Sequence, residues 1–125
     1  MALVEQLGEG HHLVRRVSPA SVTVDEREFT ASFVLAPDRC ESDFAPRRIE
    51  DLDEDAIARI LDFNPELVLL GTGSKQRFPK PAQAAAFLKR GVGIEAMDNA
   101  AAARTFNLLA SEARRVVAVF LIERP

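Results

Sequence analysis

The sequence contains no tryptophan, no tyrosine and a single cysteine, Cys40, among its 125 residues. One cysteine cannot form an internal disulfide, and no cluster of cysteines and histidines accompanies it to indicate a metal site. No apolar run reaches the roughly 20 residues that cross a bilayer, and the N-terminal segment lacks the layout of a secretory signal. We therefore expect a soluble, cytoplasmic protein with no membrane span, no bound metal and no cofactor.

The charge balance argues against nucleic acid as a partner. A net charge of -3 and a pI of about 5.4 give no overall attraction to phosphate, and the absence of tyrosine and tryptophan removes two side chains that stack on bases. The charge is unevenly distributed, because residues 1–62 carry a net -7 and residues 63–125 a net +4. This asymmetry could steer a charged partner, or it could simply reflect a solvated surface.

The first third of the sequence is typical of β structure. Segments 13–17, 21–24 and 28–35 are rich in Val, Phe and Thr, with polar turn residues at Ser18-Pro19 and Asp25-Glu26-Arg27 between them. Within 28–35 the apolar residues alternate with polar ones, which predicts one half-buried antiparallel strand. Residues 37–51 show no clear period, and we expect an irregular connection with one short strand.

Three helices are indicated in the remainder of the chain. Asp53 suits the N-cap of a helix that ends near Phe63, before Asn64-Pro65. Pro81 suits the first position of a second helix, with Gly91 just beyond its end. Asp98 suits the N-cap of a third helix, rich in alanine.

Short apolar segments alternate with these helices, at residues 67–70, 92–96 and 115–122. Such segments are typical of strands buried on both faces of a sheet. The order of elements favours an α/β fold: a single three-layer domain, residues 1–125, with a central mixed sheet flanked by helices and an N-terminal antiparallel β region.

The segment after the first of these strands is the best candidate for a binding site. Its candidate residues are Gly71, Thr72, Gly73, Ser74, Lys75 and Arg77. Open α/β sheets bind ligands beyond the carboxyl ends of their strands, and glycines, hydroxyls and cations in one loop suit a phosphate or a carboxylate. The segment matches neither phosphate-loop template, so a structural turn with solvated cations is the alternative.

A second stretch supplies three further candidate residues, Asp98, Arg104 and Asn107. Arg104 and Asn107 are three residues apart and share a helix face, so they would reach the glycine loop if strands 67–70 and 92–96 are neighbours. Asp98 could act only as a helix cap, and the other two could serve only to pin the loop.

The sequence offers no catalytic motif. No serine stands in a G-x-S-x-G pattern, Cys40 has no sequence signature of a nucleophile, and the adjacent His11 and His12 would point to opposite sides of an extended chain. We assign no catalytic residues and leave enzymatic activity uncertain, with a non-enzymatic protein favoured.

Four ordered motifs resemble a family of small α/β domains. They are residues 65–73, 76–79, 91–98 and 102–107. Their combination is similar to the Mth938-like family of bacteria, archaea and mitochondria, which includes the mitochondrial NADH dehydrogenase (complex I) assembly factor 3. The resemblance implies a compact three-layer α/β domain, an assembly role for the mitochondrial member, and no established catalytic residues.

Two functions are compatible with these observations. The first is a non-enzymatic binding or assembly module that assists a respiratory or other protein complex, with an unknown protein as its partner. The alternative is a protein that binds a small anionic ligand, or a minor enzyme, in the crevice at the strand ends. The sequence lacks a transit peptide rich in arginine, so the partner can differ from that of the mitochondrial relative.

Overall fold

The computed structural model describes residues 10–123, whose eight strands form two sheets. The smaller sheet contains β1 (Val14–Ser18), β2 (Ser21–Val24) and β3 (Arg27–Phe29), paired antiparallel in chain order. The turns between them lie at residues 19–20 and 25–26. The predicted N-terminal antiparallel region is confirmed.

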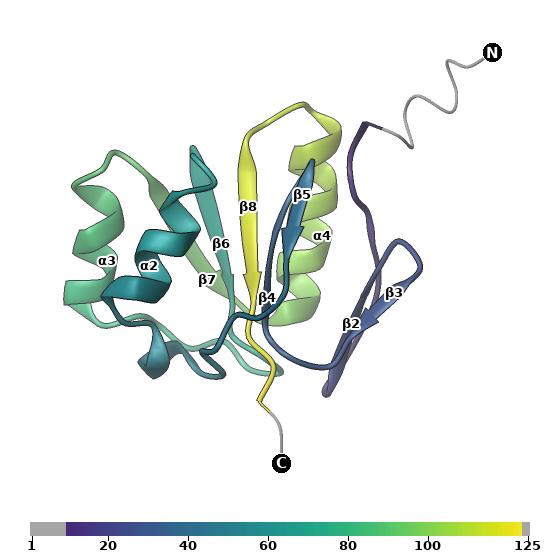
Figure 1. Cartoon of the computed structure of the whole chain (residues 1–125), viewed down its shortest axis with the longest axis horizontal. Coiled ribbons are helices and arrows are strands. Elements are labelled where there is room, and N and C mark those ends of the chain that lie inside the picture. The colour runs from purple at the N-terminus through teal and green to yellow at the C-terminus, as the bar shows by residue number, and fades with distance from the viewer. Residues whose placement is uncertain (1–9, 124–125) are drawn as a thin grey trace.

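The larger sheet is mixed and has the order β5-β4-β8-β6-β7 (Figure 1). Its strands are β4 (Phe33–Ala36), β5 (Arg39–Glu41), β6 (Leu67–Gly71), β7 (Gly93–Met97) and β8 (Val116–Phe120). β6 pairs in parallel with both β7 and β8, whereas β4 is antiparallel to β5 and β8. The three strands predicted at 67–70, 92–96 and 115–122 therefore lie side by side in one sheet.

The three α-helices begin where the sequence predicts. They are α2 (Glu54–Leu61), α3 (Pro81–Leu88) and α4 (Asn99–Ser111), whereas the short 3₁₀ helix η1 (Ile49–Asp51) lies in the segment expected to be irregular. Asp53 accepts a hydrogen bond from the Ala56 amide at 2.9 Å, and Asp98 accepts one from the Ala101 amide at 2.8 Å, so both are N-caps. Pro81 is the first residue of α3. Proline has no amide hydrogen, and this is tolerated here because amides in the first turn of a helix have no partner within the helix.

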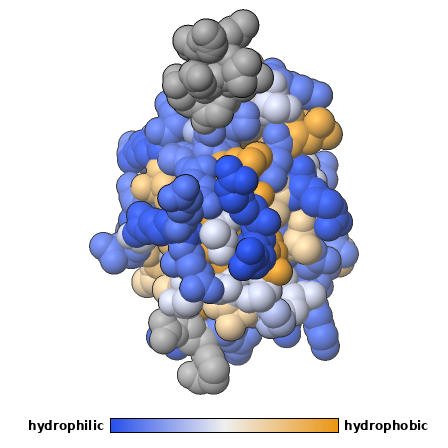
Figure 2. Space-filling view, turned by 90° about the vertical axis from the view of Figure 1, so that its right-hand side faces the viewer, coloured by the Kyte–Doolittle hydropathy of each residue, from blue (hydrophilic) through white to orange (hydrophobic). Residues whose placement is uncertain are grey.

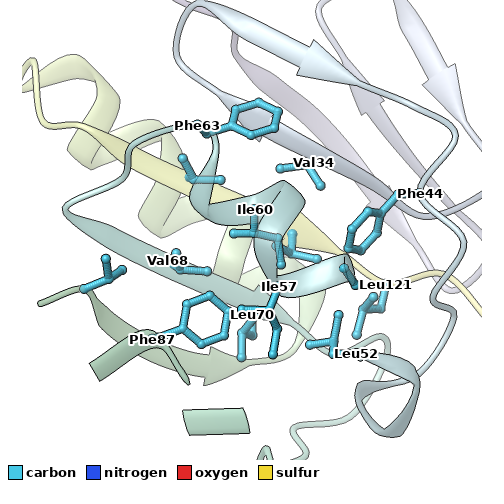
Figure 3. Close-up of a cluster of buried hydrophobic side chains, with 14 of the residues drawn as sticks. Val34, Phe44, Leu52, Ile57, Ile60, Phe63, Val68, Leu70, Phe87 and Leu121 are labelled. Carbon is cyan, nitrogen blue, oxygen red and sulfur yellow. The ribbon is translucent and has the colours of Figure 1, made fainter. Parts of the chain in front are cut away.

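The central sheet is covered on both faces, which confirms the three-layer α/β fold. α2 and α3 lie on one face, and α4 with the smaller sheet lies on the other (Figure 1). Figure 3 shows the apolar cluster beneath α2, where side chains from β6 meet the helix. A second buried cluster on the opposite face includes Phe29, Phe33, Leu69, Phe106 and Phe120.

The prediction of one continuous strand over residues 28–35 is wrong. β3 ends at Phe29, β4 begins at Phe33, and the two strands belong to different sheets. The chain leaves the ladder between them, and the buried Ser32 hydroxyl accepts a hydrogen bond from the Ile122 amide at 2.9 Å. Phe29 and Phe33 still stack, with ring centroids 4.0 Å apart. An alternating pattern can therefore continue across a break when both strands pack on one core.

The outer face of the smaller sheet carries mainly polar side chains. Figure 2 views this side of the molecule and shows a largely hydrophilic surface with apolar groups between the polar ones. Val22, Val24 and Phe29 of this sheet are buried beneath that surface. Within residues 10–123, no helix has the length and apolar character needed to cross a bilayer.

Candidate functional site

The candidate loop, residues 72–80, leaves the carboxyl end of β6. Because β6, β7 and β8 are parallel, the segments that follow them meet at the same edge of the sheet, at the lower end of the molecule in Figure 1. The Thr72 amide donates to the Met97 carbonyl at 2.9 Å, and the Leu121 amide donates to the Gly71 carbonyl at 3.0 Å. The loop is thus attached to the ends of both neighbouring strands.

Thr72 organises this loop internally. Its hydroxyl donates to the Lys75 carbonyl at 2.6 Å and accepts from the Arg77 amide at 3.0 Å. The hydroxyl that the sequence offers for a ligand is therefore used to hold the turn that presents Lys75 and Arg77.

Asn99 holds the candidate loop in place, a role that sequence reasoning did not assign to it. Its Oδ1 accepts from the Gly73 amide at 3.1 Å, and its Nδ2 donates to the Leu121 carbonyl at 3.0 Å. A Cβ atom at Gly71 would overlap this Oδ1 and lie 2.9 Å from the Val119 carbonyl oxygen. Gly71 is therefore required because the buried Asn99 amide occupies the space beside it. The available signal was an asparagine directly after the predicted helix cap Asp98, just beyond the motif 91–98.

Three predicted site residues do not join the loop. Asp98 caps α4, and the Arg104 side chain is exposed on that helix. Asn107 instead holds β1 against α4: its Oδ1 accepts from the Val14 amide and its Nδ2 donates to the Val14 carbonyl, both at 2.9 Å. The Asn107 side chain thus serves the smaller sheet and not the glycine loop.

All of the remaining predicted residues except Gly71 border a surface cavity of about 550 Å³, which we call the basic hollow. Gly71 is buried against Asn99 and does not line it. It is lined by Thr72, Gly73, Ser74, Lys75 and Arg77 from the loop and by Pro19, Ala20, Arg47, Arg48, Leu121 and Glu123 from elsewhere. Four of these side chains are cationic and one is acidic. Sequence reasoning missed Arg47 and Arg48, which lie in the irregular segment before η1.

Local hydrogen bonds position these two arginines. Their backbone amides both donate to the Asp51 carboxylate, at 3.2 Å each, and these bonds lower the pKa of Asp51 below its ordinary value. The bonded Asp51 shapes the turn, and both arginine side chains remain exposed. On the loop side, Arg77 lies 3.9 Å from the Glu50 carboxylate, a distance at which an exposed pair is weak.

The basic hollow is chemically suited to receive an anion. Guanidinium groups bind carboxylates and phosphates through paired hydrogen bonds. The lining holds four cations and one carboxylate, and the nearby carboxylates of Glu50 and Asp51 reduce its excess of positive charge without cancelling it. A larger cavity of about 630 Å³ is also lined by Arg47. Arg47 is the one cation in its lining, which also includes the carboxylate of Asp43, so this cavity is less suited to anions. Among residues 10–123, no three His, Cys, Asp or Glu side chains gather as a metal site would require.

The histidines and the cysteine lie outside the basic hollow. His12 pairs with Asp25 at 2.8 Å, whereas the His11 ring contacts the His12 carbonyl. Partial burial opposes ionisation of Asp25, yet the hydrogen bonds from His12 and from the Leu13 amide leave its pKa lowered. Burial raises the pKa of the Cys40 thiol, which disfavours the thiolate that a nucleophile needs.

Comparisons with known proteins place the chain in a family. The model of the family described as "Protein of unknown function (DUF498/DUF598)" matches residues 14–121. A Xanthomonas campestris protein of known NMR structure is 40% identical, with a TM-score of 0.82 over 89% of this chain and 84% of that one. A Bordetella pertussis protein, described as a Mth938-like domain, is 28% identical, with a TM-score of 0.77 over 88% of this chain and 85% of that one.

A Francisella tularensis protein named "13 kDa major membrane protein" is 33% identical over 73 residues, which are 58% of this chain and 59% of that protein. The alignment thus spans less than two thirds of that relative. The family model and the Xanthomonas structure each cover most of the chain, and the Xanthomonas structure agrees with the fold described above. This chain therefore belongs to the DUF498/DUF598 family and has Mth938-like structural neighbours.

Proposed function

We propose that this chain is a non-enzymatic binding module whose basic hollow recognises an acidic segment of a protein partner. The observation that carries the proposal is the gathering of Arg47, Arg48, Lys75 and Arg77 around one cavity of about 550 Å³. Their side chains come from two separate segments of a chain whose net charge is -3, so the hollow is a local exception to the overall charge.

The cations give such a site selectivity more than affinity. Each is exposed, and an exposed ion pair contributes at most about 1 kcal/mol. Several like charges around one cavity attract acidic partners and repel basic ones, so they raise the association rate and fix the orientation of the complex. A transient contact that can be released again suits a factor that acts during assembly.

The family resemblance supports the assembly form of this function. The Mth938-like family includes the mitochondrial complex I assembly factor 3, so the partner we propose is a subunit of a respiratory or another multiprotein complex. The Francisella relative is named as a membrane protein, which is compatible with a partner complex at a membrane. We propose a cytoplasmic location, with the chain acting from the aqueous side.

The test is affinity capture from the native cell with three forms of the full chain. These are the unaltered protein, Lys75→Ala with Arg77→Ala, and the control Lys89→Ala with Arg90→Ala, which removes two exposed cations beyond the end of α3. We expect an identified acidic partner to be retained by the first and third forms, to be lost from the second, and to be released by added salt. Equal capture by all three forms at all salt concentrations would refute the proposal.

A small anionic ligand is the second candidate, and the size of the basic hollow favours it. A volume of about 550 Å³ lies within the range of roughly 300 to 1,000 Å³ that small-molecule sites occupy. Calorimetric titration with phosphate and with short dicarboxylates would test it. Saturable binding that Arg47→Ala with Arg48→Ala abolishes would support a small-molecule site, and the absence of heat would exclude these anions.

A further inference from the structure

Among residues 10–123, Phe78 is the most exposed of the large apolar side chains, at 74%, and it directly follows a residue of the basic hollow. Leu88 and Leu108 are also exposed, at 61% and 59%, but both lie on helices away from the loop. A single exposed apolar residue needs no special explanation. The position of Phe78 beside Arg77, and the way the chain holds it there, distinguish it from the two leucines.

The loop that carries Phe78 is held on both sides. The Thr72 hydroxyl bonds to the Lys75 carbonyl and the Arg77 amide, and the Gln76 side chain donates to the Ala96 carbonyl at the end of β7, at 2.8 Å. Pro79 follows, and a residue before proline is restricted to extended conformations. The exposed ring therefore stands on a backbone that is already ordered, so a contact with it costs little conformational entropy.

We infer that Phe78 is the apolar anchor of the same recognition site, the residue that packs against an apolar side chain of the partner. This inference rests on the proposed function. The partner segment is an acidic peptide that carries a bulky apolar side chain within a few residues of its carboxylates. Phe78 does not line the hollow itself, but its Cα lies about 3.8 Å from that of Arg77, so a peptide bound at Lys75 and Arg77 meets the Phe78 ring at the rim, within a few of its own residues. Aromatic and arginine side chains together are typical of the residues that dominate binding energy.

A lipid surface is the competing occupant, because cations beside an exposed aromatic ring also occur in proteins that bind anionic membranes. The shape of the site favours the peptide. The cations line a cavity, which receives carboxylates that project from a chain, whereas a bilayer presents a broad and nearly flat surface. The experiment therefore includes a vesicle arm.

The test uses random short peptides displayed on phage and selected on the immobilised full chain. We expect the enriched peptides to combine at least two acidic residues with a leucine, isoleucine or aromatic residue close by. Dissociation constants are then measured for one synthetic enriched peptide against the unaltered chain, Phe78→Ala, Lys75→Ala with Arg77→Ala, and the control Leu108→Ala. Phe78→Ala should weaken binding at least about tenfold with no added salt dependence, and Leu108→Ala should have no effect.

The outcomes separate the anchor from the proposed function. If the enriched peptides are acidic but lack an apolar residue, and Phe78→Ala binds them as tightly as the unaltered chain, then Phe78 is not an anchor. The proposed function of the basic hollow is then unaffected. Peptides that depend on Phe78 but not on Lys75 and Arg77 overturn the proposed use of the hollow. If no peptide is enriched, or if vesicles containing phosphatidylglycerol bind the chain and Phe78→Ala releases them, the peptide inference is wrong. Unfolding curves of Phe78→Ala and Leu108→Ala check that both variants remain folded.

Discussion

The candidate site has an inner layer of buried residues and an outer layer of exposed residues, and the two layers differ in what their side chains bind. The inner layer consists of Gly71, Thr72 and Asn99, which are buried and whose hydrogen-bonding groups meet partners within the protein. The outer layer consists of Arg47, Arg48, Lys75, Arg77 and Phe78, whose side chains are exposed. Because the inner layer already orders the backbone, forming a complex would cost little further conformational entropy. The outer layer is therefore free to serve recognition. The difference predicts that substitutions in the two layers have separable effects on stability and on binding.

The largest effect on stability is expected from Asn99→Ala. The substitution removes the partners of the half-buried Gly73 amide and the buried Leu121 carbonyl, and a buried group left unpaired costs about 1 to 3 kcal/mol. We expect a loss of about 2 to 4 kcal/mol in the free energy of unfolding, measured by urea titration. Asn107→Ala is the matched control, because it removes a similar pair of bonds to Val14 outside the site. A change below about 0.5 kcal/mol would show that the inner layer is dispensable.

A somewhat smaller loss is expected from Gly71→Ala. The added methyl group would overlap Asn99 Oδ1 and approach the Val119 carbonyl at 2.9 Å, and overpacking of this kind costs about 1 to 3 kcal/mol. The double variant with Asn99→Ala should lose less than the sum of the two single losses, because the second change removes one of the two clashes. Strict additivity in chemical denaturation would show that the two residues do not compete for this space.

The Asp51→Asn substitution tests how the backbone of Arg47 and Arg48, two residues of the outer layer, is held in place. The pKa of Asp51 is lowered by backbone hydrogen bonds from Arg47 and Arg48, so its carboxylate binds fewer protons in the folded than in the unfolded state. Its contribution is complete above the ordinary value of 3.8 and is lost as the pH falls through the folded pKa. The variant should lose less than about 1 kcal/mol at pH 7, because the site is exposed, and it should match the unaltered chain more closely in acid. A constant difference from pH 7 to pH 2 in thermal unfolding would contradict this assignment.

The sequence was most informative where one local signal decided the structure. The run 67–70 predicted β6 because a strand buried on both faces needs apolar residues throughout, and Asp53 and Asp98 predicted helix starts because a carboxylate satisfies the first free amides. The break between Phe29 and Phe33 escaped prediction because both rings pack on the same core although their strands belong to different sheets.

The candidate site was predictable only in part, because tertiary structure brings together the residues that line the basic hollow. Loop position and residue type identified Lys75 and Arg77, but no local pattern connects them with Arg47 and Arg48, which are about 30 residues away in the sequence. Helical spacing correctly placed Arg104 and Asn107 three residues apart on α4. It could not reveal that Asn107 bonds to β1, because that contact depends on how the smaller sheet covers the helix.

The smallest effect on stability is expected where the effect on binding is greatest, in Lys75→Ala with Arg77→Ala. Both side chains are exposed, and the bonds that hold the loop use the Lys75 carbonyl and the Arg77 amide, which the substitutions keep. Arg77 loses only a long contact with Glu50, so the free energy of unfolding should change by no more than about 0.5 kcal/mol. Urea titration at low and high salt is the measurement, with Lys89→Ala and Arg90→Ala as the control pair.

If removing the two positive charges reduces the repulsion among the four cations, the variant will be slightly more stable at low salt, and this gain will disappear at high salt. A loss of several kcal/mol would instead assign both side chains to the inner layer and remove the basis for treating the hollow as a binding surface.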